Sequence, residues 1–184
     1  MPLGIHTGGF NGRSPVPGSG WCSFLAEQHH LTQINMQSLV TSLIMEGVME
    51  AFPDLRVALY EGGLVWVPAL CWRLDGLWSR LRSEVPHVKR PPSEYIRERF
   101  WFSTQPTDEA EHPHHLRQVL DWIGWDRILF ATDYPHWDFD DPRFALKVPL
   151  SAAEKKKVFP PTPRQCFVSI DRTCSEVADG HTAQ

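Results

Sequence analysis

Apolar residues recur in two alternating patterns along most of the chain. Short apolar runs rich in β-branched or aromatic residues predict strands, and they occur at 3–6, 55–60, 100–104 and 127–132. Longer segments with apolar residues at helical spacing predict amphipathic helices at 32–51, 65–81 and 114–123, with a shorter helical piece at 92–99. Strands and helices alternate, and the strands are apolar enough to be buried on both faces. We therefore predict a parallel sheet with helical crossovers, either a barrel or a doubly wound sheet.

Polar side chains stand at the end of each predicted strand, shortly before glycine or proline. They are His6, Glu61, the 103–105 segment and Asp133. In parallel α/β folds the chemistry lies at the carboxyl ends of the strands. We therefore expect these groups to converge on one rim.

Composition excludes several classes of function. The chain has 184 residues, a net charge of −4 and 42% hydrophobic residues, which is typical of one soluble globular unit. Its longest basic run is 155–157, so it lacks the electrostatic footprint of a protein that binds nucleic acid or an anionic membrane. No apolar stretch is long enough for a membrane span, and the first residues do not resemble a secretory signal, so we expect a cytoplasmic protein. The four cysteines show no C-x-x-C spacing and are expected to be free thiols.

His6, Asp133 and Glu61 are the candidates for metal chemistry. An imidazole and a carboxylate facing each other across a rim are ligand types suited to Zn²⁺ or a similar divalent ion. Glu61, from a strand between them, could act as general acid or base or as a further ligand. Spacing alone leaves the alternative open, since a single strand-end His or Asp is more often a structural hydrogen-bonding group.

Other histidines and tryptophans divide into pocket candidates and structural residues. His136 follows Asp133 on the same loop and could contact a substrate, and Trp137 is the tryptophan that we expect near the pocket. The His29-His30 pair precedes the helical pattern, on a loop that could line the pocket. The histidines at 112–115 are better explained as a solvated helix entrance than as metal ligands. The remaining tryptophans in the 66–125 region are expected to pack in the core, including Trp72.

Several segments resemble one enzyme family in uninterrupted order from Leu3 to Phe159. The segments are Phe-Pro-Asp-Leu-Arg-Val at 52–57, Glu-Gly-Gly at 61–63, the 89–96 segment and Phe-Ala-Thr-Asp-Tyr-Pro-His-Trp-Asp at 130–138. They are similar to the carboxyl-terminal half of amidohydrolase-related proteins. This branch contains aminocarboxymuconate-semialdehyde decarboxylase and related metal-dependent hydrolases and decarboxylases.

The resemblance implies a fold, a cofactor and roles for individual residues. The family fold is a distorted (β/α)₈ TIM barrel that holds one catalytic divalent metal, which we expect to be Zn²⁺. Strands 5 to 8 of that barrel would be present here, with His6 as the fifth-strand metal ligand and Asp133 as the eighth-strand ligand. The resemblance implies a small organic substrate that bears a carboxylate. Glu61 stands where the decarboxylases commonly carry a catalytic histidine, which leaves hydrolysis and decarboxylation both open.

The resemblance also leaves parts of the family pattern unmatched. No His-x-His motif stands near the start of the chain, so we expect residues 1–159 to be the carboxyl-terminal half of a barrel. Two ligands are fewer than the three that catalytic zinc sites use, and we expect weak metal binding and little activity from this chain alone. Residues 160–184 lack apolar periodicity and are expected to be a disordered tail.

Two alternatives to an enzyme follow from the same half barrel. Its open sheet edges could pair with a second copy, giving a homo-oligomer, or with a separate partner half, giving a non-catalytic interaction module. The chain could also be an inert fragment from a wrong gene model. The genomic sequence upstream of Met1 would distinguish these, since an in-frame His-x-His after an apolar strand would restore the enzyme.

Overall fold

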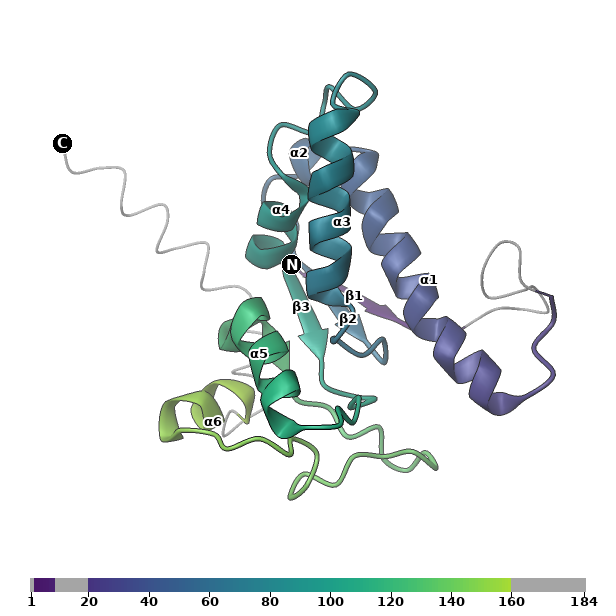
Figure 1. Cartoon of the computed structure of the whole chain (residues 1–184), viewed down its shortest axis with the longest axis vertical. Helices are drawn as coiled ribbons and strands as arrows, with labels where there is room; N and C mark the ends of the chain where they lie inside the picture. Colours follow the sequence, from purple (N-terminus) through teal and green to yellow (C-terminus); the bar gives the residue numbers. More distant parts are fainter. Residues whose placement is uncertain (1, 9–19, 160–184) are drawn as a thin grey trace.

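Four parallel strands and six α-helices make up the computed structural model, which describes residues 2–8 and 20–159 (Figure 1). The strands are β1 (Leu3–His6), β2 (Val57–Tyr60), β3 (Phe100–Ser103) and β4 (Ile128–Leu129). The helices are α1 (Leu25–Met45), α2 (Val48–Ala51), α3 (Val67–Arg80), α4 (Pro92–Arg99), α5 (Pro113–Ile123) and α6 (Ala152–Val158). The tail predicted at 160–184 and most of the loop that follows β1 lie outside the described residues.

The sheet has the order β1-β2-β3-β4, and every neighbouring pair is parallel. This arrangement confirms the predicted α/β fold with a parallel sheet and helical crossovers. Alternate side chains of the strands point to opposite faces of the sheet. Those on one face pack with the helices in the main core, and they are Val57, Leu59, Phe100, Phe102 and Ile128. Those on the other face form a small cluster of Ala58, Trp101 and Leu129.

Helix α1 departs from the helix predicted at 32–51 at both ends. It begins at Leu25, because the residues from 25 to 31 are mostly good helix formers that need no buried face. It ends before Gly47, which has φ of +75° and separates α1 from α2. A Cβ at Gly47 would lie 2.5 Å from Cδ2 of His87, so both the backbone and the packing favour glycine there.

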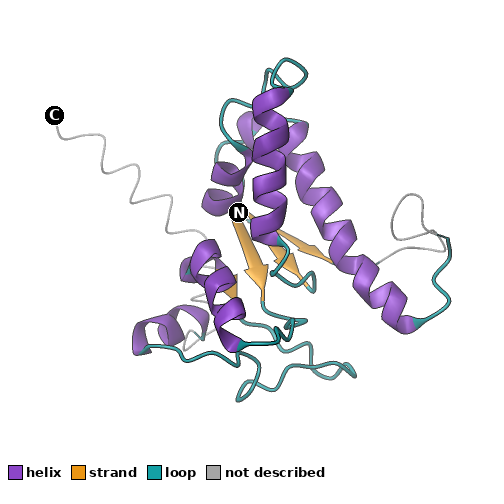
Figure 2. Cartoon of the chain, in the orientation of Figure 1, coloured by secondary structure: helices purple, strands orange, loops and turns teal. Residues whose placement is uncertain are grey.

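Strand β4 is shorter than the run predicted at 127–132. Its last pairing joins Leu129 to Ser103, where β3 also ends, so the following residues have no strand partner. The Thr104 hydroxyl continues the pairing in place of a strand, since Ala131 N–H donates to its Oγ1 at 3.3 Å. Most of the chain between β4 and α6 is therefore loop (Figure 2).

Trp72 does not pack in the core as expected. Helix α3 buries Val67, Cys71 and Leu74, and Trp72 lies beside this stripe with 63% of its surface exposed. Its ring packs edge-on against Trp122 of α5 at 6.0 Å between centroids. None of the helices in the described ranges is long and apolar enough to cross a membrane.

Candidate metal centre

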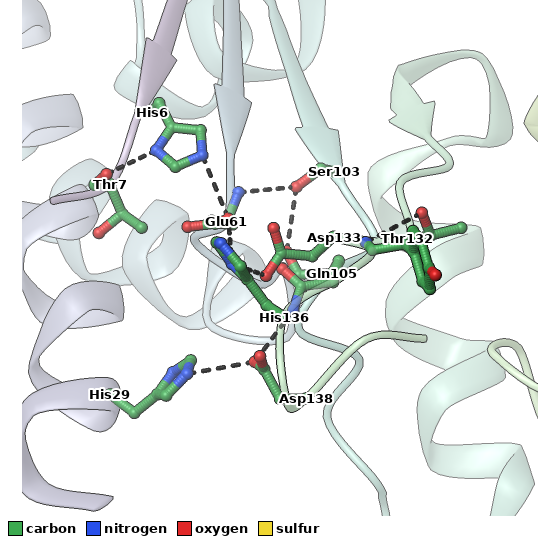
Figure 3. A network of polar contacts seen from close by, with 11 residues as sticks. His6, Thr7, His29, Glu61, Ser103, Gln105, Thr132, Asp133, His136 and Asp138 are labelled. Carbon is green, nitrogen blue, oxygen red and sulfur yellow. Dashed lines mark hydrogen bonds and ion pairs between the residues drawn. The ribbon is translucent and has the colours of Figure 1, made fainter. Parts of the chain in front are cut away.

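The strand ends bring polar side chains together as predicted (Figure 3). His6 ends β1, and its Nε2 lies 3.2 Å from Oε1 of Glu61, which follows β2. Glu61, Asp133 and His136 each offer one ligand atom, and these three atoms lie within 4.8 Å of one another. Asp133 and His136 both belong to the loop that follows β4. The parallel sheet is the reason why residues so far apart in sequence meet at one edge.

The backbone at both carboxylates is held in an unusual conformation. Glu61 has φ of +54° and Asp133 has φ of +58°, in the left-handed region that costs a non-glycine residue about 1 kcal/mol. The surrounding structure holds Glu61 through its N–H, which donates to Ser103 Oγ at 3.0 Å. The Ser103 hydroxyl in turn donates to the carbonyl of Gln105 at 3.1 Å. Such strain is found where a function requires one side-chain direction.

His136 is bound to Asp133 through both backbone and side chain. The N–H of His136 donates to the carbonyl of Asp133 at 2.8 Å, and its Nδ1 lies 2.8 Å from Asp133 Oδ2. This hydrogen bond to the carboxylate raises the pKa of His136. The ring is 63% exposed, whereas the Asp133 side chain is 15% exposed, so His136 forms the open side of the cluster.

Glu61 is the carboxyl group whose environment most favours the protonated form. Burial, followed by the hydrogen bond with Asp133, raises its pKa to about 7, against the opposing effects of His6 and His136. Its Oε1 is buried and accepts no hydrogen bond, although His6 Nε2 is close. A buried carboxylate oxygen without a partner is costly.

The residues of this cluster fit a divalent metal. Two carboxylates and imidazole nitrogens are ligands that Zn²⁺ and Mn²⁺ accept. A cation beside Asp133 would also relieve the repulsion between the two adjacent carboxyl groups of Glu61 and Asp133. His6 stands next to this group through Glu61 rather than inside the three-residue set.

A second polar group lies beside the cluster and was not anticipated. Asp138 Oδ2 accepts from Gln105 Nε2 at 3.0 Å and lies 3.1 Å from Nε2 of His29 on α1. The His29 ring packs edge-on against Trp137, with centroids 5.2 Å apart. Asp138 could have been suspected from its position on the loop of Asp133 and His136, but its partners come from segments remote in sequence.

The histidines at the start of α5 remain apart from this centre. The exposed rings of His112, His114 and His115 lie against one another with centroids 4.1 to 5.5 Å apart, and the rings of His112 and His114 are stacked. In the described part of the chain they form no group whose ligand atoms could share an ion. This agrees with the interpretation of a solvated helix entrance.

Sequence comparison shows relatives that are longer than this chain. A γ-resorcylate decarboxylase from Polaromonas sp. is 29% identical over 119 residues, which cover 63% of this chain and 35% of the relative. A γ-resorcylate decarboxylase from Rhizobium radiobacter is 32% identical over 100 residues, or 53% of this chain and 29% of the relative. The chain therefore spans about a third of the length of these curated relatives.

Solved structures share the fold. An amidohydrolase from Mycobacterium avium subsp. paratuberculosis matches with a TM-score of 0.66 and 22% identity, over 92% of this chain and 42% of that chain. A dihydroxybenzoic acid decarboxylase from Polaromonas sp., solved with bound manganese and 2-nitroresorcinol, matches with a TM-score of 0.52 and 26% identity, over 76% of this chain and 40% of that chain. The four-stranded parallel sheet is thus consistent with part of a TIM barrel.

The family model for amidohydrolases matches residues 1–167, which is most of the chain. The match includes every residue of the candidate metal centre. On this evidence the chain belongs to the amidohydrolase family.

Proposed function

We propose that this chain carries part of the active site of a metal-dependent carboxy-lyase or hydrolase. The observation that carries the proposal is the buried Oε1 of Glu61, which accepts no hydrogen bond and lies among Asp133, His136 and His6. A divalent cation bound by Asp133 beside this oxygen would offset the charge of the two adjacent carboxyl groups. Mn²⁺ is as suitable as the expected Zn²⁺, since a structural relative contains manganese.

Asp133 and His6 are the proposed metal ligands, from opposite ends of the sheet. The left-handed backbone of Asp133 and its hydrogen bond with His136 both direct its carboxylate into the cluster. His6 is fixed by its Nδ1, which lies 2.6 Å from the carbonyl of Thr7, so that Nε2 faces Glu61. Bound there, a divalent ion would polarise a substrate carboxylate or activate water.

Glu61 is the proposed acid or base. In the metal-free chain burial raises the pKa of Glu61 to about 7, and a bound dication nearby would lower it toward the ordinary carboxyl value, so that the group can give up or take a proton. Its side chain is 18% exposed, so it can reach a bound molecule while staying shielded from bulk water. This position suits a proton transfer to or from a substrate held beside the metal.

The proposed substrate is a small organic carboxylate, and decarboxylation is favoured over hydrolysis. The similar proteins from Polaromonas sp. and Rhizobium radiobacter are decarboxylases of γ-resorcylate, a dihydroxybenzoate. His136 and Trp137 stand on the open side of the cluster, 63% and 72% exposed, where a planar molecule could lie against them. We assign both to substrate contact.

Metal titration tests the ligand set. We expect the 184-residue chain to bind Mn²⁺ in a calorimetric titration, and we expect Asp133→Asn and His6→Ala to weaken binding at least about 100-fold because each removes a direct ligand. His114→Ala removes an exposed histidine from α5 and should leave the affinity unchanged. Failure of the chain to bind either Mn²⁺ or Zn²⁺ would refute the proposal. The same titration measures whether binding is as weak as two ligands suggest.

An activity assay separates metal binding from proton transfer. Carbon dioxide release from 2,6-dihydroxybenzoate is measured with the Mn²⁺-loaded chain, from which we expect slow turnover because it carries only part of the site. Glu61→Gln should retain metal affinity within about tenfold and lose turnover, because the amide cannot exchange a proton. His136→Ala should raise KM more than it lowers kcat. Loss of metal binding in Glu61→Gln would instead make Glu61 a ligand.

A further inference from the structure

The amino-terminal part of α1 is tied to the loops that surround the candidate metal centre. His29 Nε2 lies 3.1 Å from Asp138 Oδ2, and the His29 ring packs edge-on against Trp137. One turn further along α1, Gln33 Nε2 donates to Asp108 Oδ1 at 3.2 Å. Asp108 follows β3 and Asp138 follows β4. A single helix therefore contacts the loops of two strands at the edge where the cluster lies.

Asp138 is the residue at which these contacts meet (Figure 3). Its side chain is only 13% exposed, so its negative charge needs partners. Oδ2 accepts a hydrogen bond from Gln105, whose side chain is completely buried. Nε2 of His29 contacts the same oxygen. Two donors on one oxygen of a shielded carboxylate give it a defined orientation.

Gln105 links Asp138 to the backbone of Glu61 through Ser103. The backbone carbonyl of Gln105 accepts a hydrogen bond from the Ser103 hydroxyl, and Ser103 Oγ accepts one from the backbone N–H of Glu61. A continuous set of hydrogen bonds therefore runs from Glu61 through β3 to Asp138, and His29 extends it to α1.

The loop after β4 needs such an anchor. It contains Asp133 and His136 and has no helix or strand until α6. Beyond its turns, it is attached at Asp140, whose Oδ2 accepts from the N–H and hydroxyl of Thr107. Asp138 is the attachment nearest to His136, and Trp137 lies between the two.

We propose that Asp138 is a positioning residue, which joins His29 of α1 to Gln105 so that the loop after β4 holds Asp133 and His136 against Glu61. His29 and Trp137 then form one wall of the site. This role rests on the proposed metal centre, because it concerns how the loop places Asp133 and His136 in that centre.

The experiment combines metal affinity with amide hydrogen exchange in the 184-residue chain. Asp138→Ala and His29→Ala should each weaken Mn²⁺ binding about tenfold, as loss of outer contacts around metal ligands does. The double variant should lose no more than the stronger single variant, because both act through one contact. His29→Gln keeps a donor near the position of Nε2 and should restore affinity.

Matched controls come from the same loop and the same helix. Asp141→Ala removes a carboxylate whose side chain bonds Arg143 within the loop, and His30→Ala removes the exposed neighbour of His29. Neither should change Mn²⁺ affinity. A general loss of stability would lower the unfolding midpoint, but it would not weaken Mn²⁺ binding in the Asp138 and His29 variants while leaving it unchanged in the controls.

Hydrogen exchange makes the outcome independent of the metal. Amides of residues 133–140 should exchange faster in the metal-free Asp138→Ala and His29→Ala variants than in the controls. Unchanged exchange there refutes the positioning role, whether or not the chain binds Mn²⁺. Normal Mn²⁺ affinity in both variants of a chain that does bind Mn²⁺ refutes it as well, while leaving the proposed function standing. Absence of Mn²⁺ binding in the unaltered chain refutes the proposed function alone.

Discussion

Glu61 and Asp133 both combine a strained backbone with a partly buried carboxylate. Their φ values of +54° and +58° are ones that asparagine, aspartate or glycine adopt more readily than glutamate. The contacts that offset this strain come from Ser103 in one case and His136 in the other. The fold thus holds the side chains of Glu61 and Asp133 close together against the repulsion between two carboxylates.

The raised pKa of Glu61 predicts how stability changes with pH in the metal-free chain. Its pKa is about 7 in the folded state against 4.5 for the ordinary carboxyl group, so between these values the folded chain binds more protons than the unfolded chain. The free energy of unfolding should therefore fall as pH rises through this window. Glu61→Gln should flatten the fall, and urea unfolding at about pH 5 and about pH 8 with a chelator present measures it.

The exposed carboxylate of Glu94 on α4 provides the control for this pH effect. Glu94→Gln should keep the pH dependence of the unaltered chain. Equal slopes for Glu61→Gln and the unaltered chain would show that the Glu61 carboxyl is ionised in the folded state at low pH, contrary to the expectation.

A buried tyrosine of helix α4 bonds to two other segments of the chain. The Tyr95 hydroxyl accepts from the N–H of Lys89 at 3.1 Å and of Arg90 at 3.0 Å, and it donates to the Glu50 carboxylate of α2. These bonds join α4 and the segment before it to α2. The tyrosine is 1% exposed, so water cannot replace its hydroxyl.

Tyr95→Phe should lower the free energy of unfolding by about 2 kcal/mol, because it leaves two backbone N–H groups and a carboxylate without their partner. Urea unfolding followed by circular dichroism measures the change. Tyr134→Phe, at a ring that is 75% exposed, should cost less than about 0.5 kcal/mol. Similar values for the two variants would show that water satisfies the groups around position 95.

Strand β1 forms one edge of the four-stranded sheet. Leu3 donates its N–H to the carbonyl of Arg56, just before β2, and Thr7 donates to Tyr60, the last residue of β2. No described strand pairs with the opposite edge of β1. Unpaired edges invite association with another strand. This feature supports the alternative in which the sheet pairs with a second copy or with a partner.

Sedimentation velocity should therefore show association that increases with concentration. Leu3→Lys places a charge at an edge residue that is 42% exposed and should reduce the association, because a lysine disfavours edge pairing. Phe52→Lys, at an exposed residue that follows α2, is the matched control. A monomer at every concentration would contradict the prediction.

Local patterns determined most of the elements of this protein. The predicted 92–99 piece is α4, residue for residue, since its flanking prolines and its polar stretch act over a few residues. The capping box at Ser151 and Glu154 is present at the start of α6, again through neighbouring groups. Strand-end polar residues were identifiable because each strand is a short apolar run, and a parallel sheet places their carboxyl ends together.

Tertiary structure decided the features that depend on partners distant in sequence. Gly47 separates α1 from α2 where the apolar period continues, because its φ of +75° lies outside the helical region, and His87 fills the space that a Cβ there would need. β4 ends at Leu129 because β3 ends opposite it. The Asp138 network joins groups from α1 and two loops. Periodicity along a chain records which face of an element is buried, but contacts between separate segments depend on how those elements pack, and so they emerge only when the chain is folded.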